Sequence, residues 1–338
     1  MATYREVKGY SVKSVSSDPA NVKEGQIWYN STAKVIKVSP NIAAWASSNS
    51  MSTARANTGN TSSGPRDASL VFGGESSPNT RSETESYDGS SWTNAPDINT
   101  GRRLMAGFGT QTAAVCSGGI IPPATPQTID NVEEWDGSSW TEVTDVPVAG
   151  IYEHAGTGTL TAGLIFAGDV ATGDARTNKT YHYDGTNWTA GGDMNTSRRS
   201  PGAGGTQTAA VGFGGIPGGP NATTNVTELY DGSSWTNGNN MGNDTGEMGY
   251  GGPQTNAISA SGSDHPTFSV TRTELYDGTN WSAGPTVATA RKGGGTTSAS
   301  GNTSAILFGG LTAPGTPNFT GVTEEFTAAA TTRTVDVS

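Results

Sequence analysis

A short pattern recurs along this chain at nearly constant intervals, and this repeat constrains the fold more than any other feature. The pattern is an aromatic residue, then Asp-Gly, two small polar residues and a Trp, as in YDGSSW. The aromatic residues that open its five copies are Tyr87, Trp135, Tyr183, Tyr230 and Tyr276, so the steps are 48, 48, 47 and 46 residues. A repeat of this regularity predicts architecture, because each copy must build one similar unit of structure.

The Trp of the pattern marks six positions in phase. They are Trp45, Trp92, Trp140, Trp188, Trp235 and Trp281, where Trp45 lies 47 residues before Trp92. A period in the high forties is typical of the four-stranded blade of a β-propeller. A large aromatic side chain on an outer strand can fill the space against the neighbouring sheet, so we expect these tryptophans to pack between blades.

A second mark, an apolar strand that ends in a Gly pair, lies between successive tryptophans. Its clear copies end at Gly73 and Gly74, Gly118 and Gly119, Gly214 and Gly215, and Gly309 and Gly310. Degenerate copies, IFAGD at 165–169 and AISASG at 257–262, bring the number to six. The absent side chains let backbones approach closely at the crowded inner end of a blade. GTQTAAV also occurs verbatim at 109–115 and 205–211, two periods apart, which indicates duplication within the gene.

The Asp-Gly step favours a tight hairpin, because Gly accepts positive φ and Asp can hydrogen-bond the following backbone. With charged residues at only 14% of the chain, helix-building residues are scarce. The sequence therefore predicts an all-β, six-bladed propeller. We expect a short N-terminal arm over residues 1–34, a possible docking segment, and the propeller over residues 35–338.

The ends of the repeat predict how the ring closes. VTEEFT at 322–327 aligns with earlier third strands but no Trp follows it, whereas Trp45 has no preceding Gly mark. We expect the strand around Trp45 to complete the last blade and so remove the free edges. The C-terminal TTRTVDVS is a second candidate for the same edge, either in competition or in addition.

Taken together, the Gly pair, the aromatic-Asp hairpin and the following Trp resemble the kelch-type β-propeller over about residues 35–330. The resemblance implies the propeller fold. The turn between Tyr and Trp, DGSS or DGTN, is shorter than the usual kelch turn, so the chain is kelch-like in its blades without matching that family at every point.

A charged pair also follows the repeat. Ten residues after four of the tryptophans stand Arg55, Arg102, Arg198 and Arg291, with Gly150 and Thr245 at the other two places. Two residues before the aromatic mark, or before its equivalent Phe326, stand Glu85, Glu133, Glu228, Glu274 and Glu324, with Tyr181 as the exception. Every repeat with the Arg has the Glu. This predicts four buried or half-buried ion pairs within blades. The alternative is a ring of cations at one mouth of the central channel.

Several classes of partner and cofactor are disfavoured. A net charge of -11 argues against nucleic acid, which is bound through clustered Lys and Arg. No run approaches the roughly 20 apolar residues of a membrane span, and the N-terminus has no apolar core of a signal peptide. Cys116 is expected as a packed thiol, and His154, His182 and His265 lack metal-ligand spacing, so we expect no cofactor and no metal.

An enzyme is not favoured. The pattern is similar to the Asp-box of sialidase propellers, but that box places a residue between Asp and Gly. A glycosidase also needs a paired acid and nucleophile, and the breaks in the repeat supply only Glu153, His154 and Glu247. A glycosidase-type propeller enzyme is therefore the least favoured alternative.

The segment KEGQIWYNSTAKVIKV, residues 23–38, resembles the short β-hairpin segments near the start of bacteriophage tail and fibre proteins, especially those of marine phages. The resemblance implies a virion structural protein, a tail or appendage component made in the host cytoplasm. Its partners would be other virion proteins, in a symmetric homo-oligomer, with host attachment as one use.

The alternative is a module that binds a glycan, such as a host surface glycan, or a peptide. Two long Pro-containing connections, residues 120–130 and 312–321, follow Gly marks and should lie on one face of the ring. They are nearly uncharged, which suits a protein contact as well as a sugar.

Overall fold

The computed structural model describes residues 12–19, 27–38, 43–77, 79–121, 127–170, 175–219, 222–264, 267–312, 318–328 and 333–335. The chain divides into two compact units. The larger is Trp45–Phe326, and the smaller combines Met1–Ala44 with Thr327–Ser338. Apart from one 3-10 turn, η1 (Gly301–Thr303), all regular structure in the described residues is β.

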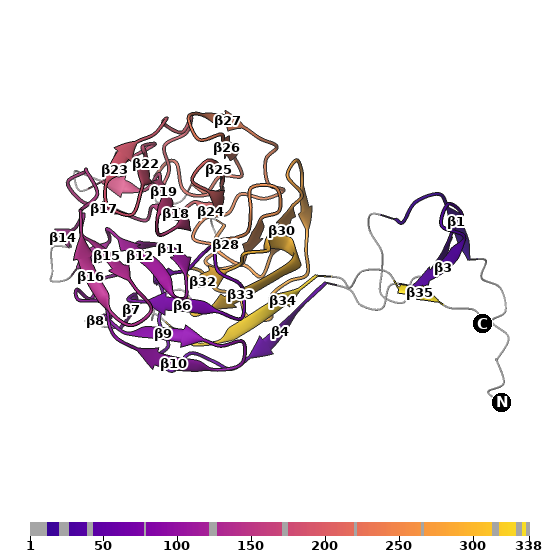
Figure 1. The fold of residues 1–338 in the computed structure, drawn as a ribbon, viewed down its shortest axis with the longest axis horizontal. Coiled ribbons are helices and arrows are strands. Elements are labelled where there is room, and N and C mark those ends of the chain that lie inside the picture. Colours follow the sequence, from indigo (N-terminus) through magenta and orange to yellow (C-terminus); the bar gives the residue numbers. More distant parts are fainter. Residues whose placement is uncertain are drawn as a thin grey trace. The chain divides into compact units, whose positions relative to one another are not determined.

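The larger unit consists of antiparallel sheets of four strands, which Figure 1 shows arranged around a common centre. Sheet 1 holds β5 (Gly59–Asn60), β6 (Ser69–Phe72), β9 (Thr84–Tyr87) and β10 (Trp92–Ala95), from the centre outward. Sheet 2 holds β11 (Ala106–Thr110), β12 (Ala113–Ser117), β15 (Val132–Trp135) and β16 (Trp140–Val143). Sheet 3 holds β18 (Ala155–Thr159), β19 (Ala162–Phe166), β22 (Thr180–Tyr183) and β23 (Trp188–Ala190).

The remaining sheets of the unit repeat this order. Sheet 4 holds β24 (Gly202–Thr206), β25 (Ala209–Phe213), β26 (Thr227–Tyr230) and β27 (Trp235–Asn237). Sheet 5 holds β28 (Gly249–Gly251), β29 (Ile258–Ala260), β30 (Thr273–Tyr276) and β31 (Trp281–Ala283). Sheet 6 holds β32 (Gly295–Thr297), β33 (Ser304–Phe308), β34 (Thr323–Thr327) and β4 (Ala44–Ser48).

Two short strand pairs and one short three-stranded sheet lie beside sheets 1, 2 and 3. They are β7 (Glu75–Ser76) with β8 (Asn79–Thr80), β13 (Ile120–Ile121) with β14 (Gln127–Thr128), and β17 (Ile151–Tyr152) with β20 (Asp169–Val170) and β21 (Ala175–Arg176).

The inner strands are rich in Gly because their backbones nearly touch. Each inner strand contacts the next in the order β5, β11, β18, β24, β28 and β32, and β32 contacts β5. A Cβ atom on Gly107 would lie 2.5 Å from the backbone nitrogen of Asn60, and one on Gly204 would lie 2.4 Å from the carbonyl oxygen of Gly252. Larger residues at these positions would force the sheets apart.

The repeated Asp-Gly element forms the outer hairpin of each copy. In sheet 1, Tyr87 ends β9 and pairs with Trp92, the first residue of β10. Oδ1 of Asp88 accepts hydrogen bonds from the backbone N–H groups of Ser90, at 2.8 Å, and Ser91, at 2.7 Å. These bonds lower the pKa of Asp88 to about 2. Asp136, Asp184, Asp231 and Asp277 make the same turn.

The six tryptophans of the repeat lie between sheets. The Trp92 indole meets the Phe308 ring of sheet 6 at 4.9 Å, and its N–H donates to Thr323 Oγ1 at 3.0 Å. In the same way, Trp140 meets Phe72, Trp235 meets Phe166 and Trp281 meets Phe213 of the preceding sheet, and each donates to a Thr hydroxyl there. Trp188 lies farther from Phe108, at 6.5 Å, and donates to the carbonyl of Thr144. Trp45 donates to Thr273 of sheet 5 and packs on Phe326 of its own sheet. Each Trp thus joins two sheets, as its spacing predicts.

Sheet 6 takes its outer strand, β4, from residues that precede sheet 1 in the chain. The described residues of the C-terminal segment do not pair at this edge. They form β35 (Arg333–Val335), which pairs with β3 (Val35–Val38) of the smaller unit. Because Val35–Val38 pairs on both sides within the smaller unit, the units divide at Ala44 and Phe326, and the predicted division after residue 34 is displaced.

The smaller unit is one sheet in the order β1 (Lys13–Val15), β2 (Ile27–Asn30), β3, β35. Asp18 organises it, since its carboxylate accepts hydrogen bonds from Trp28 Nε1 at 3.1 Å, Asn30 Nδ2 at 2.8 Å and Lys37 Nζ at 2.6 Å. These donors lower the pKa of Asp18 to about 2. The predicted hairpin therefore exists as β2 and β3.

Candidate functional site

The structure places each of the four predicted Arg residues beside its predicted Glu in the same sheet. Arg102 Nη2 lies 2.6 Å from Glu133 Oε1, and Arg198 Nη2 lies 2.6 Å from Glu228 Oε1. The Arg55–Glu85 pair is at 3.2 Å, and Arg291 contacts Glu324 directly. All four guanidinium groups are fully buried. They therefore do not form the solvent-facing ring of cations that was the alternative.

Each Glu has a second role that the sequence did not reveal. The Glu228 carboxylate accepts hydrogen bonds from the backbone N–H groups of Asn195, at 2.7 Å, and Thr196, at 3.2 Å, in the loop that enters its sheet. Glu274 binds the corresponding N–H groups of Gly242 and Asn243 without any Arg partner. The Glu is thus an anchor for the entering loop, which explains why sheet 5 keeps it.

The Arg position of sheet 3 is Ile151, not Gly150 as its distance from Trp140 predicted. In the other sheets, the second Gly of the pair donates its N–H to the carbonyl of the next Arg position, as Gly168 does to Arg198 at 2.8 Å. Gly119 donates to Ile151 at 2.8 Å. One additional residue in this loop shifts the count. Ile151 then packs in the same apolar cluster as Tyr181, which replaces the Glu.

Two residues beyond each Arg position, a closed cycle of backbone hydrogen bonds surrounds the centre of the unit. Its members are Asn57, Leu104, Glu153, Ser200, Glu247 and Gly293. Each donates its N–H to the carbonyl of the preceding member at 2.7 to 3.3 Å, and Asn57 donates to Gly293. All six have positive φ, between 48° and 61°. We call this cycle the backbone ring.

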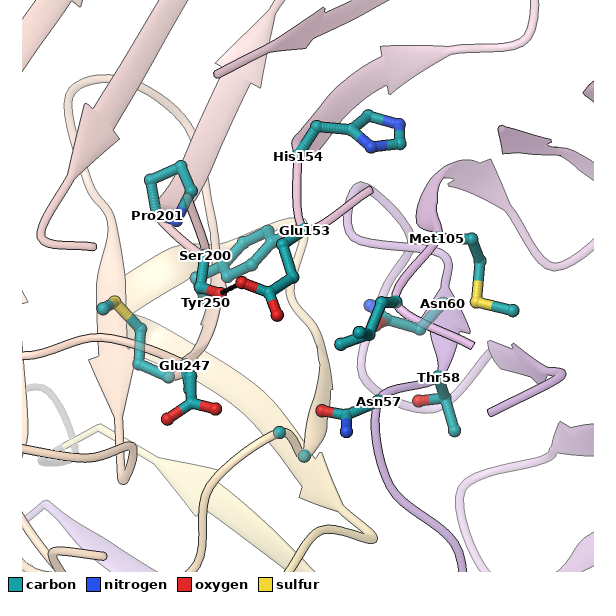
Figure 2. A pocket seen from close by; sticks show the side chains of 14 residues that line it. Asn57, Thr58, Asn60, Met105, Glu153, His154, Ser200, Pro201, Glu247 and Tyr250 are labelled. Atoms are coloured by element: carbon teal, nitrogen blue, oxygen red, sulfur yellow. Dashed lines mark hydrogen bonds between the residues drawn. The ribbon is translucent and has the colours of Figure 1, made fainter. Parts of the chain in front are cut away.

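A hollow of about 90 Å³ opens over the backbone ring (Figure 2). Glu153 and Glu247 extend side chains there, and Met105, Met248 and Tyr250 form apolar parts of the wall. Residues in or next to all six inner strands line it, so it lies at one end of the space that these strands enclose. We call that space the channel and this hollow its mouth. It combines a rigid backbone with acidic, amide and apolar side chains, which is the composition of a binding site.

Ion pairs surround the mouth. Arg199 Nη1 lies 3.2 Å from Glu153, and Lys292 Nζ lies 2.9 Å from Glu247. Arg103 contacts Glu75, which also accepts a hydrogen bond from Asn57 Nδ2 at 2.6 Å. Burial raises the pKa of Glu153, while Arg199 and the Ser200 hydroxyl act in the opposite direction. The acidic groups that could have suggested catalysis are therefore each held by a cation.

Comparisons with known proteins define the fold and no more. No family model matches the chain, and no curated protein matches it. Among solved structures, that of a protein named YjhT superimposes with a TM-score of 0.67 and 13% sequence identity. The match covers 81% of this chain and 95% of YjhT. This chain has a β-propeller-like, all-β fold.

Two reactive side chains of the propeller, His154 and Cys116, are buried. Nε2 of His154 lies 3.0 Å from the Ser117 hydroxyl, and burial lowers the pKa of His154 to about 3, so the imidazole is neutral. Burial raises the pKa of the Cys116 thiol to about 11. His182 is half-buried, packs edge to face against Tyr230 and shares a hydrogen bond with its hydroxyl at 2.7 Å. His265 lies outside the described residues. Within the described ranges, no group of three His, Cys, Asp or Glu residues could hold a metal ion.

No helix in the described part of the chain is both long and apolar enough to cross a membrane.

One sequence feature of the mouth does not belong to the repeated motifs. Each of three buried Arg residues is followed by a second basic residue, which gives Arg102–Arg103, Arg198–Arg199 and Arg291–Lys292. These pairs occur in alternate repeats. The second residue of each is the cation that pairs with a carboxylate at the mouth.

Proposed function

We propose that this protein is a structural component of a bacteriophage virion, in the tail or an appendage, that acts through protein–protein contacts. The observation that carries the proposal is the smaller unit. Segments from both sides of the propeller in the sequence combine there into one sheet that includes the phage-like hairpin. A separate unit of this kind suits attachment to other virion proteins, while the propeller presents its faces to a further partner or a host surface.

The connection between the units supports this use. The chain enters the propeller through β4 and leaves it through β34, and these strands are neighbours in sheet 6. A load applied to the smaller unit would therefore reach two hydrogen-bonded strands together, and both ends of the propeller would be held. Such an arrangement suits a protein that is anchored through one unit.

The proposal includes the finer architecture. The six sheets act as the blades of one kelch-like propeller, and β4 closes it as the outer strand of the last blade. Support comes from the junction of sheets 6 and 1, where Gly310 donates to the Arg55 carbonyl at 2.9 Å and Asn57 donates to Gly293 at 2.8 Å. The same bonds occur at the other junctions.

No catalytic step and no cofactor is part of the proposal. A glycosidase needs one carboxyl group free to give a proton and another free to attack or to activate water. Glu153 and Glu247 are each engaged by a cation and a hydroxyl group. In the proposed role the chain is made in the host cytoplasm and assembles into the particle as a symmetric homo-oligomer.

Mass spectrometry of purified phage particles tests the function. Peptides of this chain should be present at a fixed ratio to the major structural proteins, and the ratio should persist through a high-salt wash. Recovery of the chain only from the soluble fraction of infected cells would contradict the proposal.

The mouth supports a second candidate, a module that binds a glycan or peptide. Asn57, Glu153 and Glu247 offer hydrogen-bonding groups beside the Tyr250 ring and two Met side chains. Binding of soluble oligosaccharides to the purified chain, lost in Asn57→Ala, would favour this candidate. Hydrolysis of a host polysaccharide, lost in Glu153→Gln or Glu247→Gln, would instead assign the protein to the enzymes.

A further inference from the structure

The mouth of the channel has an approximate threefold pattern, although the propeller has six sheets. The residue after the buried Arg position is a cation in sheets 2, 4 and 6, namely Arg103, Arg199 and Lys292. In sheets 1, 3 and 5 the same position holds Ala56, Tyr152 and Gly246. Each cation reaches back to a carboxylate of the preceding odd-numbered sheet, Glu75, Glu153 or Glu247. We call these six charged residues the mouth face. Arg199 also lies 3.7 Å from Asp169, a buried carboxylate of sheet 3.

Each carboxylate of the mouth face also has a polar neighbour. For Glu153 this is the Ser200 hydroxyl of sheet 4, at 2.8 Å, whereas for Glu75 and Glu247 it lies within the same sheet. Glu75 accepts from Asn57 Nδ2 at 2.6 Å, and Glu247 accepts from the Ser263 hydroxyl at 2.8 Å. Glu247 and Asn57 are members of the backbone ring, whereas Glu75 and Ser263 follow the Gly pair of their sheets. The carboxylate and its neighbour have thus exchanged positions between sheets 1 and 5. The ion pair recurs although the positions that build it differ.

The fold does not require this pattern. The backbone ring closes through main-chain atoms, and its members in sheets 2, 4 and 6 are Leu104, Ser200 and Gly293. The side chains of the mouth face are between 12% and 35% exposed, and ion pairs with that access to water contribute little stability. The hollow at the other end of the channel is lined by Ser, Thr, Gly, Pro and Ala residues. The charge pattern is therefore a feature of one mouth.

We propose that the mouth face binds the end of a homotrimeric protein whose threefold axis coincides with the channel. Three identical chains would then each meet one exposed cation of the mouth face, and each contact would strengthen the others by raising their effective concentration. The groups offered by the trimer are carboxylates. Arg103 and Arg199 are more exposed than Glu75 and Glu153, and Lys292 is about as exposed as Glu247, so the cations have N–H donors to spare.

This inference rests on the proposed function only in taking the trimer to be another virion protein. It adds the symmetry, the contact chemistry and a ratio of one propeller to three partner chains.

Cross-linking in purified particles tests it. The Arg103→Lys/Arg199→Lys variant keeps every charge and, with Lys292, presents three amines at equivalent positions. A carbodiimide joins amines to carboxyl groups in direct contact, so cross-links to the chain's own Glu75, Glu153 and Glu247 report that each amine reacts. We expect all three lysines to be joined also to the same acidic residue of one partner, and a product that contains one propeller and three partner chains.

The trimer proposal would be overturned if only one or two of the three lysines were joined to the partner, or if they were joined to different partner peptides. Cross-links to the chain's own carboxylates alone would overturn it too. Lys179, a 55% exposed lysine paired with Asp193, is the matched control and should not join that partner residue. If the chain is absent from particles, the proposed function fails. The same cross-linking is then done in the cells that produce the chain. The trimer proposal stands there only if all three lysines join the same residue of one partner and the product holds three partner chains.

Charge reversal gives a second readout. Arg103→Glu/Arg199→Glu/Lys292→Glu should lower recovery of the partner with the propeller at least tenfold, and added salt should weaken the native contact. Lys179→Glu should leave both unchanged. An unchanged recovery in a triple variant that melts like the native chain would also overturn the proposal.

Discussion

Among single residues, Arg198 offers the sharpest test of the buried ion pairs. Both it and Glu228 are fully buried, and burial lowers the pKa of Arg198 to about 10. Arg198→Ala should cost about 3 to 5 kcal/mol in the free energy of unfolding, because it leaves a buried carboxylate without its cation. Urea unfolding measures the loss. Lys179→Ala removes an exposed pair and should leave the midpoint unchanged.

A double variant that restores the stability lost in Arg198→Ala must still provide the hydrogen-bond acceptor that Glu228 supplies to the entering loop. If apolar residues replaced both Arg198 and Glu228, the N–H groups of Asn195 and Thr196 would be left without a hydrogen-bond acceptor. We expect Arg198→Met/Glu228→Gln to recover part of the stability, because Gln keeps an acceptor and carries no charge. If Arg198→Met/Glu228→Leu proved the more stable, the loop-anchoring role would be refuted.

His154 predicts a pH dependence at the same scale. Its pKa is about 3 in the folded protein, below the ordinary value of 6.5, so the unfolded chain binds its proton first. Titration of His154 therefore leaves the free energy of unfolding unchanged above about pH 6.5. As the pH drops from there toward 3, it lowers the free energy of unfolding by at most about 1.4 kcal/mol per pH unit. In His154→Gln this part of the slope should vanish. Equal slopes of unfolding free energy against pH in the two proteins would refute the assignment.

At the scale of elements, β4 should be essential and the strands before it dispensable for the propeller. Deleting residues 1–34 removes β1 and β2 of the smaller unit, whereas deleting residues 1–48 also removes the outer strand of sheet 6. The longer deletion exposes the edge of β34, which invites pairing with other chains. We expect the shorter variant to melt like the full chain and the longer one to aggregate, by light scattering during heating. Identical behaviour of both would contradict closure by β4.

Elements marked by side chains were predictable from the sequence, and elements held by main-chain atoms were not. The Tyr87–Trp92 hairpin and the strand before Gly73 need particular residues, so their spacing shows in the sequence. The backbone ring needs only a tolerated positive φ, so its members range from Leu104 to Gly293 and share no signature. The position of Ile151 was mispredicted for another reason. One extra loop residue changes its distance in sequence from Trp140 but does not change the fold. The pairing of β35 with β3 lies outside the repeat, where no spacing applies.

For the whole molecule, the junction of sheets 6 and 1 decides whether the propeller opens locally or only as a unit. The amides of Asn57 and Gly310 bond across that junction at 2.8 and 2.9 Å, while those of Ser200 and Gly215 bond across internal junctions at 2.7 and 2.8 Å. Because the geometry is the same, these four amides should exchange with deuterium at similar rates, set by global unfolding. Native-state exchange measured by mass spectrometry of peptides checks this. If Asn57 and Gly310 exchanged much faster than Ser200 and Gly215, closure through β4 would be the weak point, and the propeller would open there before it unfolds.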